Sequence, residues 1–177
     1  PRAKWPTAAF APTPPPILLV SWKSLSIQPK EHRHNPSRYV RNTKVNKVKV
    51  NDDPWDYPGS GGSLIVPLTS QDKREHFLLD ISRARIDLQK GKYQHRARQI
   101  VVLVRLDFGG SPHRNPNDQE VSCPHLHVYR EGFGDKWAMA VPADKFPNLG
   151  DLWQTLLDFM NFCNVVDPPA INQGLFA

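Results

Sequence analysis

QIVVLVRL, residues 99–106, is the stretch that decides the fold. Hydrophobic residues occupy both odd and even positions across it, and only Gln99 and Arg105 are polar. Because successive side chains of a strand point to opposite faces of a sheet, this pattern predicts a central strand that is covered on both faces. The chain is therefore expected to form a sheet with this strand inside it.

Four shorter segments before this strand also have the composition of β-strands. Residues 77–81 (FLLDI) and residues 85–88 (RIDL) each predict one strand, the second with clean alternation. Leu64–Leu68 contains Pro67, and because proline cannot donate a ladder hydrogen bond, this strand is expected at a sheet edge. The alternating residues 44–50 (KVNKVKV) predict one further short edge strand.

Residues 123–138, CPHLHVYREGFGDKWA, predict a hairpin with two chemically different faces. Pairing Glu131 with Lys136 across the turn places His127 opposite Ala140. By the same alternation, one face of the hairpin is almost wholly apolar and the other is polar. The polar face collects His125, His127, Tyr129, Glu131 and Lys136.

One amphipathic helix is expected near the C-terminal end. From Leu149 to Cys163 the apolar residues follow three- and four-residue spacing, with Asn148 as the expected N-cap. We expect this helix to cover the apolar face of the hairpin. That face consists of Leu126, Val128, Trp137 and Met139. The predicted class is α+β: an antiparallel β-meander with one C-terminal amphipathic helix packed on one face.

The distribution of charge divides the chain into two unequal parts. Residues 1–50 carry ten basic residues and one acidic residue, whereas residues 51–177 carry thirteen basic and sixteen acidic residues. The overall net charge of +6 therefore says little about nucleic-acid binding by the larger part. We expect residues 1–50, which are also rich in proline, to be a basic arm that is disordered or foreign to the core. Residues 51–177 are expected to form a single α+β domain.

Apolar runs and cysteines indicate the compartment. No run approaches the ~20 apolar residues of a membrane-spanning helix, and no apolar segment of the signal-peptide type precedes residues 9–11. The two cysteines, Cys123 and Cys163, indicate reduced thiols rather than a disulfide framework. A cytoplasmic protein with no membrane partner is therefore expected.

The histidine face is the first candidate for chemistry. His125 and His127 lie on the same face of one strand, roughly 7 Å apart along the backbone. That spacing suits two ligands of one metal ion or two imidazoles on one phosphate, and the preceding loop offers His113, Asp118 and Glu120 as candidates for the remaining ligand positions. The candidate catalytic residues are His125, His127, Glu131, Lys136, Tyr129 and His113.

A structural interpretation of the same residues is equally simple. Histidines alternate on many strands without a metal ion, and Glu131 with Lys136 would form a cross-strand ion pair that closes the hairpin. No cofactor is predicted on this interpretation. A divalent metal ion held by His113, His125 and His127 is the alternative.

A basic stretch is the second candidate surface. Residues 83–105 contain seven arginines and lysines around Tyr93, a pattern typical of a surface that binds a nucleic-acid backbone with one stacking ring. The alternative is a hairpin edge protected by charge. The residues predicted to bind nucleic acid or phosphate are Arg83, Arg85, Lys92, Tyr93, Arg96, Arg98 and Arg130.

Five segments carry a resemblance to known proteins. They are PWDYPGSGGSLIVPL (54–68), HFLLDISRARIDLQKGKYQHRARQIVVLVRLDFGG (76–110), PHRNPN (112–117), PHLHVYREGFGDKWA (124–138) and LWQTLLDFMNFCNV (152–165). In this order they resemble a bacterial and archaeal family of small domains of unknown function, with the signature PHRNPDG…PHLHxYREGxGDKWA. Here Asn117-Asp118 stand where the signature has Asp-Gly. The resemblance covers about residues 52–177 and implies a cytoplasmic prokaryotic protein, without implying an activity.

Two functions are therefore open. The first, which we favour, is a non-catalytic domain that binds RNA or a protein partner and in which the histidines are structural. The second is a small hydrolase that cleaves phosphodiester bonds in RNA, with His125 and His127 as acid and base or as metal ligands and Glu131 as a partner base. The sequence does not decide whether the protein is an enzyme, and it does not indicate an oligomeric state.

Overall fold

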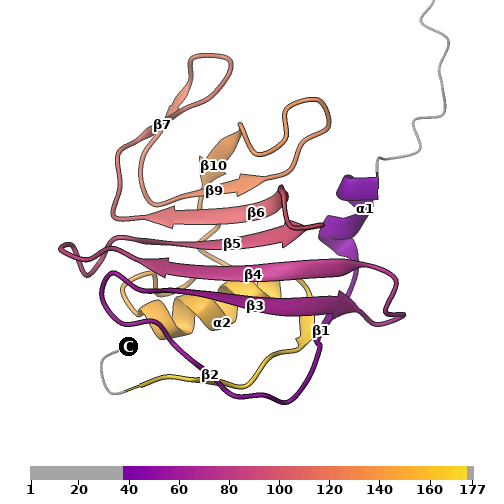
Figure 1. Ribbon diagram of the computed structural model, residues 1–177. Helices are drawn as coiled ribbons and strands as arrows, with labels where there is room; N and C mark the ends of the chain where they lie inside the picture. The colour runs from indigo at the N-terminus through magenta and orange to yellow at the C-terminus, as the bar shows by residue number, and fades with distance from the viewer. Residues whose placement is uncertain (1–37, 175–177) are drawn as a thin grey trace, which may run out of the picture. The chain divides into compact units, whose positions relative to one another are not determined.

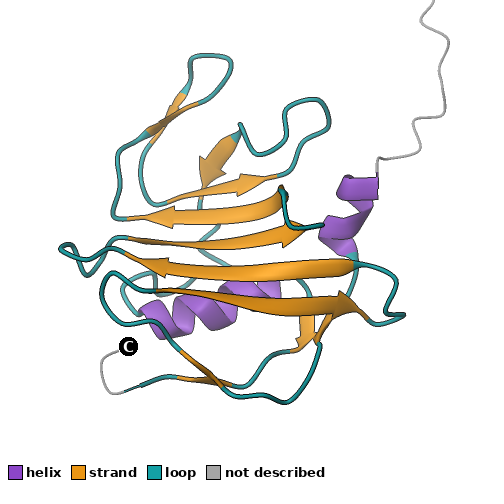
Figure 2. Cartoon of the chain, in the orientation of Figure 1, coloured by secondary structure: helices purple, strands orange, loops and turns teal. Residues whose placement is uncertain are grey.

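The computed structural model of the protein describes residues 38–174, which form two α-helices and one large β-sheet with two small ribbons (Figure 1, Figure 2). The helices are α1 (Arg38–Lys44) and α2 (Leu152–Phe162). The strands are β1 (Lys47–Lys49), β2 (Trp55–Asp56), β3 (Ser63–Ser70), β4 (His76–Arg83), β5 (Gly91–Ala97), β6 (Val101–Phe108), β7 (His113–Arg114), β8 (Glu120–Val121), β9 (His125–Val128), β10 (Ala138–Ala140), β11 (Val165–Asp167) and β12 (Ile171–Asn172). None of the described helices is long and apolar enough to cross a membrane.

The large sheet has the strand order β10-β9-β6-β5-β4-β3-β1-β11. Every neighbouring pair in it is antiparallel except β1 and β11, which run parallel. Helix α2 lies on one face of this sheet (Figure 1). The predicted class, an antiparallel meander with a C-terminal helix packed on one face, is confirmed.

The central strand predicted at residues 99–106 is β6, which begins at Val101 and lies between β5 and β9. The register between β5 and β6 shifts at His95, so that β6 carries one extra residue, Leu103, between the partners of His95 and Arg96. Leu103 and its neighbour Val104 are both buried. This bulge is the reason that hydrophobic residues occupy both parities of the strand.

The hydrophobic core lies between the sheet and α2. Tyr93 on β5 contacts Phe159 of α2 with ring centroids 5.9 Å apart, and its hydroxyl donates to the carbonyl of Leu152 at 2.8 Å. Leu126 on β9 is fully buried in the same core, as expected for the apolar face of the hairpin. Met139, by contrast, is 41% exposed because it lies on the edge strand β10.

Helix α2 begins one turn later than expected. Asp151 is the N-cap, and its side chain accepts a hydrogen bond from the amide of Gln154 at 3.0 Å. The predicted cap, Asn148, instead accepts from the amide of Gly150 within the preceding turn. Both residues have a capping side chain, and the turn at residues 148–150 decides between them.

Two strand predictions between residues 64 and 88 need correction. Residues 85–88 form no strand but lie in the turn between β4 and β5, where the backbone amide of Lys90 donates to the carbonyl of Asp87 at 3.0 Å and Ile86 is 94% exposed. Four alternating residues fit a turn as well as a strand. The segment with Pro67 lies in β3, which is not an edge strand of the sheet. Proline is tolerated because β1 pairs only with residues 68–70 of β3. On the side of β1, Pro67 therefore has no partner strand to which it would have to donate a hydrogen bond.

Residues 38–50 belong to the folded region. The edge strand expected at residues 44–50 forms as β1 but is not at an edge, because it pairs with both β3 and β11, and Lys47 in it is fully buried. Its ammonium donates to the carbonyl of Cys163 at 2.8 Å and to the carbonyl of Thr43 at 3.2 Å, so it caps the ends of both helices. The domain boundary expected at residue 50 therefore falls inside the fold, and our expectation for residues 1–37 lies outside the described residues.

Candidate metal centre

The hairpin of β9 and β10 has the predicted faces in a different register. His127 pairs with Ala138, whereas the sequence analysis placed it opposite Ala140. The difference is two residues, and side chains alternate with a period of two, so the faces are conserved. His125 and His127 therefore lie on the side of the sheet away from α2.

The turn of this hairpin contains a small loop of its own. The amide of Arg130 donates to the carbonyl of Gly134 at 2.8 Å, and Gly134 has a positive φ, which glycine adopts without strain. Residues 135–137 then curve back to the sheet. The predicted pairing of Glu131 with Lys136 is wrong: both side chains are exposed and, within residues 38–174, they form no ion pair with each other.

Three histidines meet on this face. His113 comes from β7, and His125 and His127 come from β9; one ring nitrogen from each lies within 4.8 Å of the others. The ring centroids of His113 and His127 are 4.6 Å apart, and those of His125 and His127 are 5.1 Å apart. His127 is fully buried and His125 nearly so, whereas His113 is half-buried. The cluster is thus accessible from the side of His113.

Hydrogen bonds to the backbone fix the protonation of two of these rings. Nδ1 of His127 lies 2.8 Å from the carbonyl of Asp135, and Nε2 of His113 lies 2.9 Å from the carbonyl of Lys136. A carbonyl only accepts, so these two nitrogens carry the hydrogen. The lone pairs are therefore on Nε2 of His127 and Nδ1 of His113. Metal-binding histidines usually have such a bond at the second nitrogen.

The third histidine has an unsatisfied atom. Nδ1 of His125 is buried without a hydrogen-bond partner among the described residues. Such an atom costs roughly 1–3 kcal/mol while it has no partner. Burial lowers the pKa of His125 below its ordinary value, and the neighbouring His127 and His113 lower it further, against the opposing effect of Asp107. The neutral imidazole, which is the form that binds metals, is thereby favoured.

An arginine and an aspartate on β6 complete the surroundings. Oδ2 of Asp107 lies 3.4 Å from Nε2 of His127 and 3.6 Å from Nε2 of His125. Arg105 donates from Nε to Asp107 at 2.9 Å and forms an ion pair with Asp135. Burial alone would raise the pKa of Asp107, but the neighbouring His127 and Arg105 hold it below the ordinary value.

Arg105 also contacts the cluster directly. Its Nη2 donates to Nε2 of His127 at 3.0 Å. A metal ion bound to that nitrogen would take the place of this hydrogen bond. The guanidinium would still have the carboxylates of Asp107 and Asp135 as acceptors.

Asn115 places the third histidine. This buried side chain donates from Nδ2 to the carbonyl of Ala138 at 3.0 Å and accepts from the amide of Ala138 at 2.7 Å. The two bonds attach the β7–β8 ribbon, and with it His113, to the outer strand β10. The sequence analysis did not single out Asn115, although PHRNPN contains it two residues after His113.

Other residues around the histidine cluster were also not predicted from the sequence. Arg105 pairs with His127 and Asp107 with His125 across β6 and β9, so all four side chains share one face. The signal in the sequence was the polar pair at alternate positions at the end of an otherwise apolar strand. Asp135 gave no such signal, because it acts on His127 through its backbone carbonyl.

The remaining candidate catalytic residues lie apart from the histidines. Tyr129 packs against Tyr39 of α1, with ring centroids 5.5 Å apart. Glu131 is exposed in the hairpin loop, and Lys136 contributes its carbonyl rather than its ammonium. The structure therefore unites His113, His125 and His127 and leaves the side chains of the other three outside the cluster.

The basic stretch does not form one surface. Tyr93, the predicted stacking ring, is fully buried under α2 and cannot stack on a base. Arg96 donates from Nε and Nη2 to the two carboxylate oxygens of Asp80, both at 2.5 Å. Arg83 donates to the carbonyl of Pro58 at 3.3 Å. The other predicted residues are dispersed: Arg85 and Arg98 in exposed turns, Arg130 over the ring of Trp137, and Lys92 on the histidine face.

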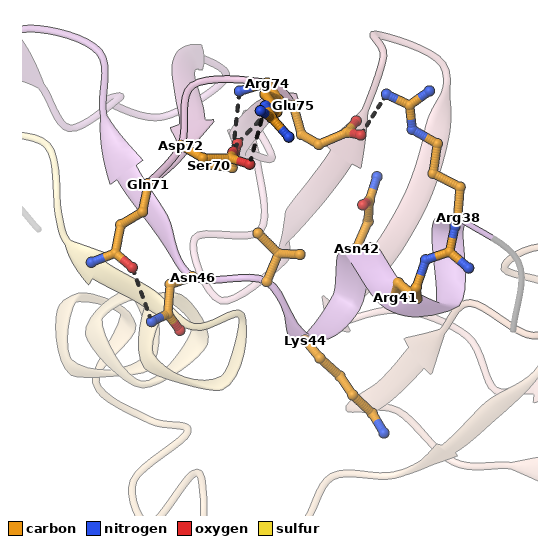
Figure 3. Close-up of a pocket in the computed structure, with 11 residues that line it drawn as sticks. Arg38, Arg41, Asn42, Lys44, Asn46, Ser70, Gln71, Asp72, Arg74 and Glu75 are labelled. Atoms are coloured by element: carbon orange, nitrogen blue, oxygen red, sulfur yellow. Dashed lines mark hydrogen bonds and ion pairs between the residues drawn. The ribbon is translucent and has the colours of Figure 1, made fainter.

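A separate groove lies between α1 and the turn that joins β3 to β4 (Figure 3). Its volume is about 770 Å³. Two of its arginines are close to carboxylates that neutralise their charge: Arg38 pairs with Glu75 at 2.5 Å, and Arg74 lies 3.9 Å from Asp72. Lys44 points away from the other side chains (Figure 3). The side chains of this groove therefore do not converge on one point as the three histidines do.

The fold and the cluster define an α+β domain with three histidines gathered on the face of its sheet that α2 leaves uncovered. A family model described as "Family of unknown function (DUF6978)" matches residues 41–165, and the protein belongs to this family. The match begins within α1 and includes all three histidines. No curated protein and no solved structure matches the chain.

Proposed function

We propose that this domain binds one divalent transition-metal ion through His113, His125 and His127. The observation that carries the proposal is the convergence of three ring nitrogens within 4.8 Å, two of the rings being buried. Imidazole ligands suit zinc, cobalt, nickel or copper, whereas magnesium and calcium take oxygen ligands. Three protein ligands leave a fourth position for water or another ligand.

Further features of the site support a metal ion rather than three structural rings. The second nitrogens of His113 and His127 donate to backbone carbonyls, as in known metal sites. The negative charge of Asp107 lies beside two of the rings and would balance part of the charge of the ion.

We do not extend this proposal to cleavage of RNA. Glu131 and Tyr129, which were expected to assist the histidines, lie away from the cluster, and the expected stacking ring is buried. The function proposed is therefore a metal-dependent binding domain. We also place it in the cytoplasm of a prokaryote, a proposal supported by the free thiols of Cys123 and Cys163 and by the signature around the histidines.

Titration of metal-free protein with Zn²⁺ and Co²⁺ tests the proposal. Binding of one ion per chain is expected, with visible absorption bands of four-coordinate Co²⁺. The midpoint of thermal unfolding should rise, because an ion at 100 times its Kd stabilises the folded state by about 2.7 kcal/mol. His113→Ala, His125→Ala and His127→Ala should each weaken binding by at least ~100-fold, which exceeds the usual loss for a supporting residue.

His76→Ala is the matched control, since His76 is an exposed histidine on β4 and lies outside the cluster. This variant should bind metal as the wild type does. Equal affinity of the wild type and the three cluster variants, or no binding by the wild type, would show that the histidines are structural.

A further inference from the structure

A cavity of about 420 Å³ adjoins the histidine cluster. One row of paired residues forms its floor: Ser82 on β4 pairs with Lys92 on β5, Lys92 with Asp107 on β6, and Asp107 with His125 on β9. Paired residues on neighbouring strands share a face, so all four side chains point to the same side of the sheet. Since neighbouring strands are about 4.8 Å apart, Lys92 and His125 are separated by roughly 10 Å at the backbone.

The charge of this cavity is positive. Lys90 and Lys92 line it, against the single carboxylate of Asp107, whereas the guanidinium of Arg83 lies over the ring of Tyr57 instead. Asp107 is already engaged by Arg105 at 2.9 Å. Lys90 and Lys92 form no ion pair within the part of the chain that the structure describes. The side chain of Lys92 thus lies on the cavity side of the sheet, and neither lysine is ion-paired with a carboxylate among the described residues.

The remaining walls of the cavity come from the turn after β4 and the loop after β6. Gly91 lies so close to the ring of Phe108 that a Cβ there would be 2.7 Å from it, so only glycine fits where β5 passes this ring. Ser82 and Ser111 add hydroxyl groups. The volume is within the range of small-molecule sites and exceeds that of a phosphate ion alone.

We infer that this cavity binds a small phosphate monoester, with its phosphate between Lys92 and the metal ion at the histidine cluster. A lysine ammonium binds phosphate as a point charge, and the fourth position of a three-histidine site accepts an oxygen ligand. His125, which lies in both the cavity and the cluster, connects the two. The metal contact rests on the proposed function, whereas the contact with Lys90 and Lys92 does not.

Titration of Co²⁺-loaded and metal-free protein with inorganic phosphate, phenyl phosphate and acetate tests this inference. The heat of binding and the visible spectrum of bound Co²⁺ are the two readouts. Both phosphates should bind the loaded protein and change the Co²⁺ spectrum, and acetate should bind at least ~10-fold more weakly, since it carries half the charge of a phosphate dianion. Lys92→Gln should weaken phosphate binding ~10-fold or more without changing the affinity for Co²⁺.

Lys145→Gln, which removes an exposed lysine outside the cavity, is the control and should bind phosphate normally. Lys90→Gln is a second variant on an exposed turn, and it should weaken phosphate binding by a smaller factor. Thermal unfolding of each variant checks that the fold is retained.

The outcomes separate the two proposals. If Co²⁺ binds and phosphate does not, or if Lys92→Gln binds phosphate like the wild type, the phosphate site is refuted and the metal centre stands. Acetate binding as tightly as phosphate would also overturn the assignment. If Co²⁺ does not bind, the metal centre is refuted; phosphate binding to metal-free protein that Lys92→Gln weakens would then support the lysine part of the site alone.

Discussion

Two buried histidines on opposite faces of one sheet have very different surroundings. His95 on β5 and His127 on β9 are both fully buried. Neither nitrogen of His95 has a hydrogen-bond partner among the described residues, and its ring stacks on Phe77 with centroids 5.2 Å apart. Both nitrogens of His127 have polar neighbours, and His113 lies against its ring.

The comparison shows that burial alone does not identify a functional histidine. His95 fills space in the core as an aromatic ring. Burial, with a smaller effect from the charge of Lys47, holds its pKa well below the ordinary value, so the ring is neutral. The second histidine differs because backbone carbonyls orient it and other imidazoles meet it. Fixed polar partners, rather than low exposure, mark the candidate metal centre.

The largest expected difference is in metal affinity. His127→Leu should weaken Co²⁺ binding by at least ~100-fold, whereas His95→Leu should leave it within ~2-fold of the wild type. The same pair should diverge in stability: His95→Leu removes two unsatisfied nitrogens and should raise the free energy of unfolding by about 1 kcal/mol. Metal titration and urea denaturation of metal-free protein measure the two effects. A large loss of metal affinity in His95→Leu would abolish the distinction between the two faces.

The next effect is the dependence of stability on acid pH. Below pH 6.5 the unfolded chain protonates His95 while the folded chain does not, so the unfolded state binds more protons. The free energy of unfolding should therefore fall with decreasing pH, by up to about 1.4 kcal/mol per pH unit from this group. Urea denaturation between pH 7 and pH 5, with a chelator present, measures the slope. It should be shallower in His95→Leu than in the wild type, and equal slopes in the two proteins would contradict the assignment.

The smallest effect concerns the buried lysine beside His95. Burial lowers the pKa of Lys47 to about 8, so above pH 8 the folded state binds fewer protons than the unfolded state. Stability should consequently rise by about 1 kcal/mol between pH 8 and pH 9. Above pH 9 the thiol of Cys163, whose pKa burial raises to about 12, opposes this rise because only the unfolded chain ionises it.

Lys47→Met provides the comparison for that prediction. The variant lacks the titrating ammonium, so the difference in unfolding free energy between wild type and variant should grow from pH 8 to pH 9. Denaturation curves at pH 7, 8 and 9 measure it. A constant difference would mean that Lys47 keeps its ordinary pKa despite its burial.

The sequence predicts which face of the sheet a side chain lies on better than it predicts which residues pair between strands. The hairpin register was wrong by two residues, yet both histidines were assigned to the correct face, because an even shift preserves alternation. The strand expected at residues 85–88 failed because four alternating residues carry too little information. Lys47 was assigned to a basic arm, since a charged residue gives no sign in the sequence that helix carbonyls will receive it in the core.

The same limit applies to the candidate site. His125 and His127 were recognisable from alternation on one strand, and His113 from its place in the preceding loop. Asn115 and the carbonyl of Asp135 were not, because their roles depend on contacts with backbone groups rather than on side-chain type. What the sequence indicates are the residues that could bind a ligand; the bonds that hold them in place require the structure.

The attachment of the β7–β8 ribbon has a consequence for how the domain would respond to its ion. His113 belongs to this ribbon, His125 and His127 belong to the main sheet, and twelve positions of chain separate the first two. An ion held by all three would act as a clasp that closes this segment into a ring, reducing the conformational freedom of the unfolded loop. Binding of the ion should therefore order the β7–β8 ribbon, and slower exchange of the amide hydrogens of the ribbon would detect that ordering.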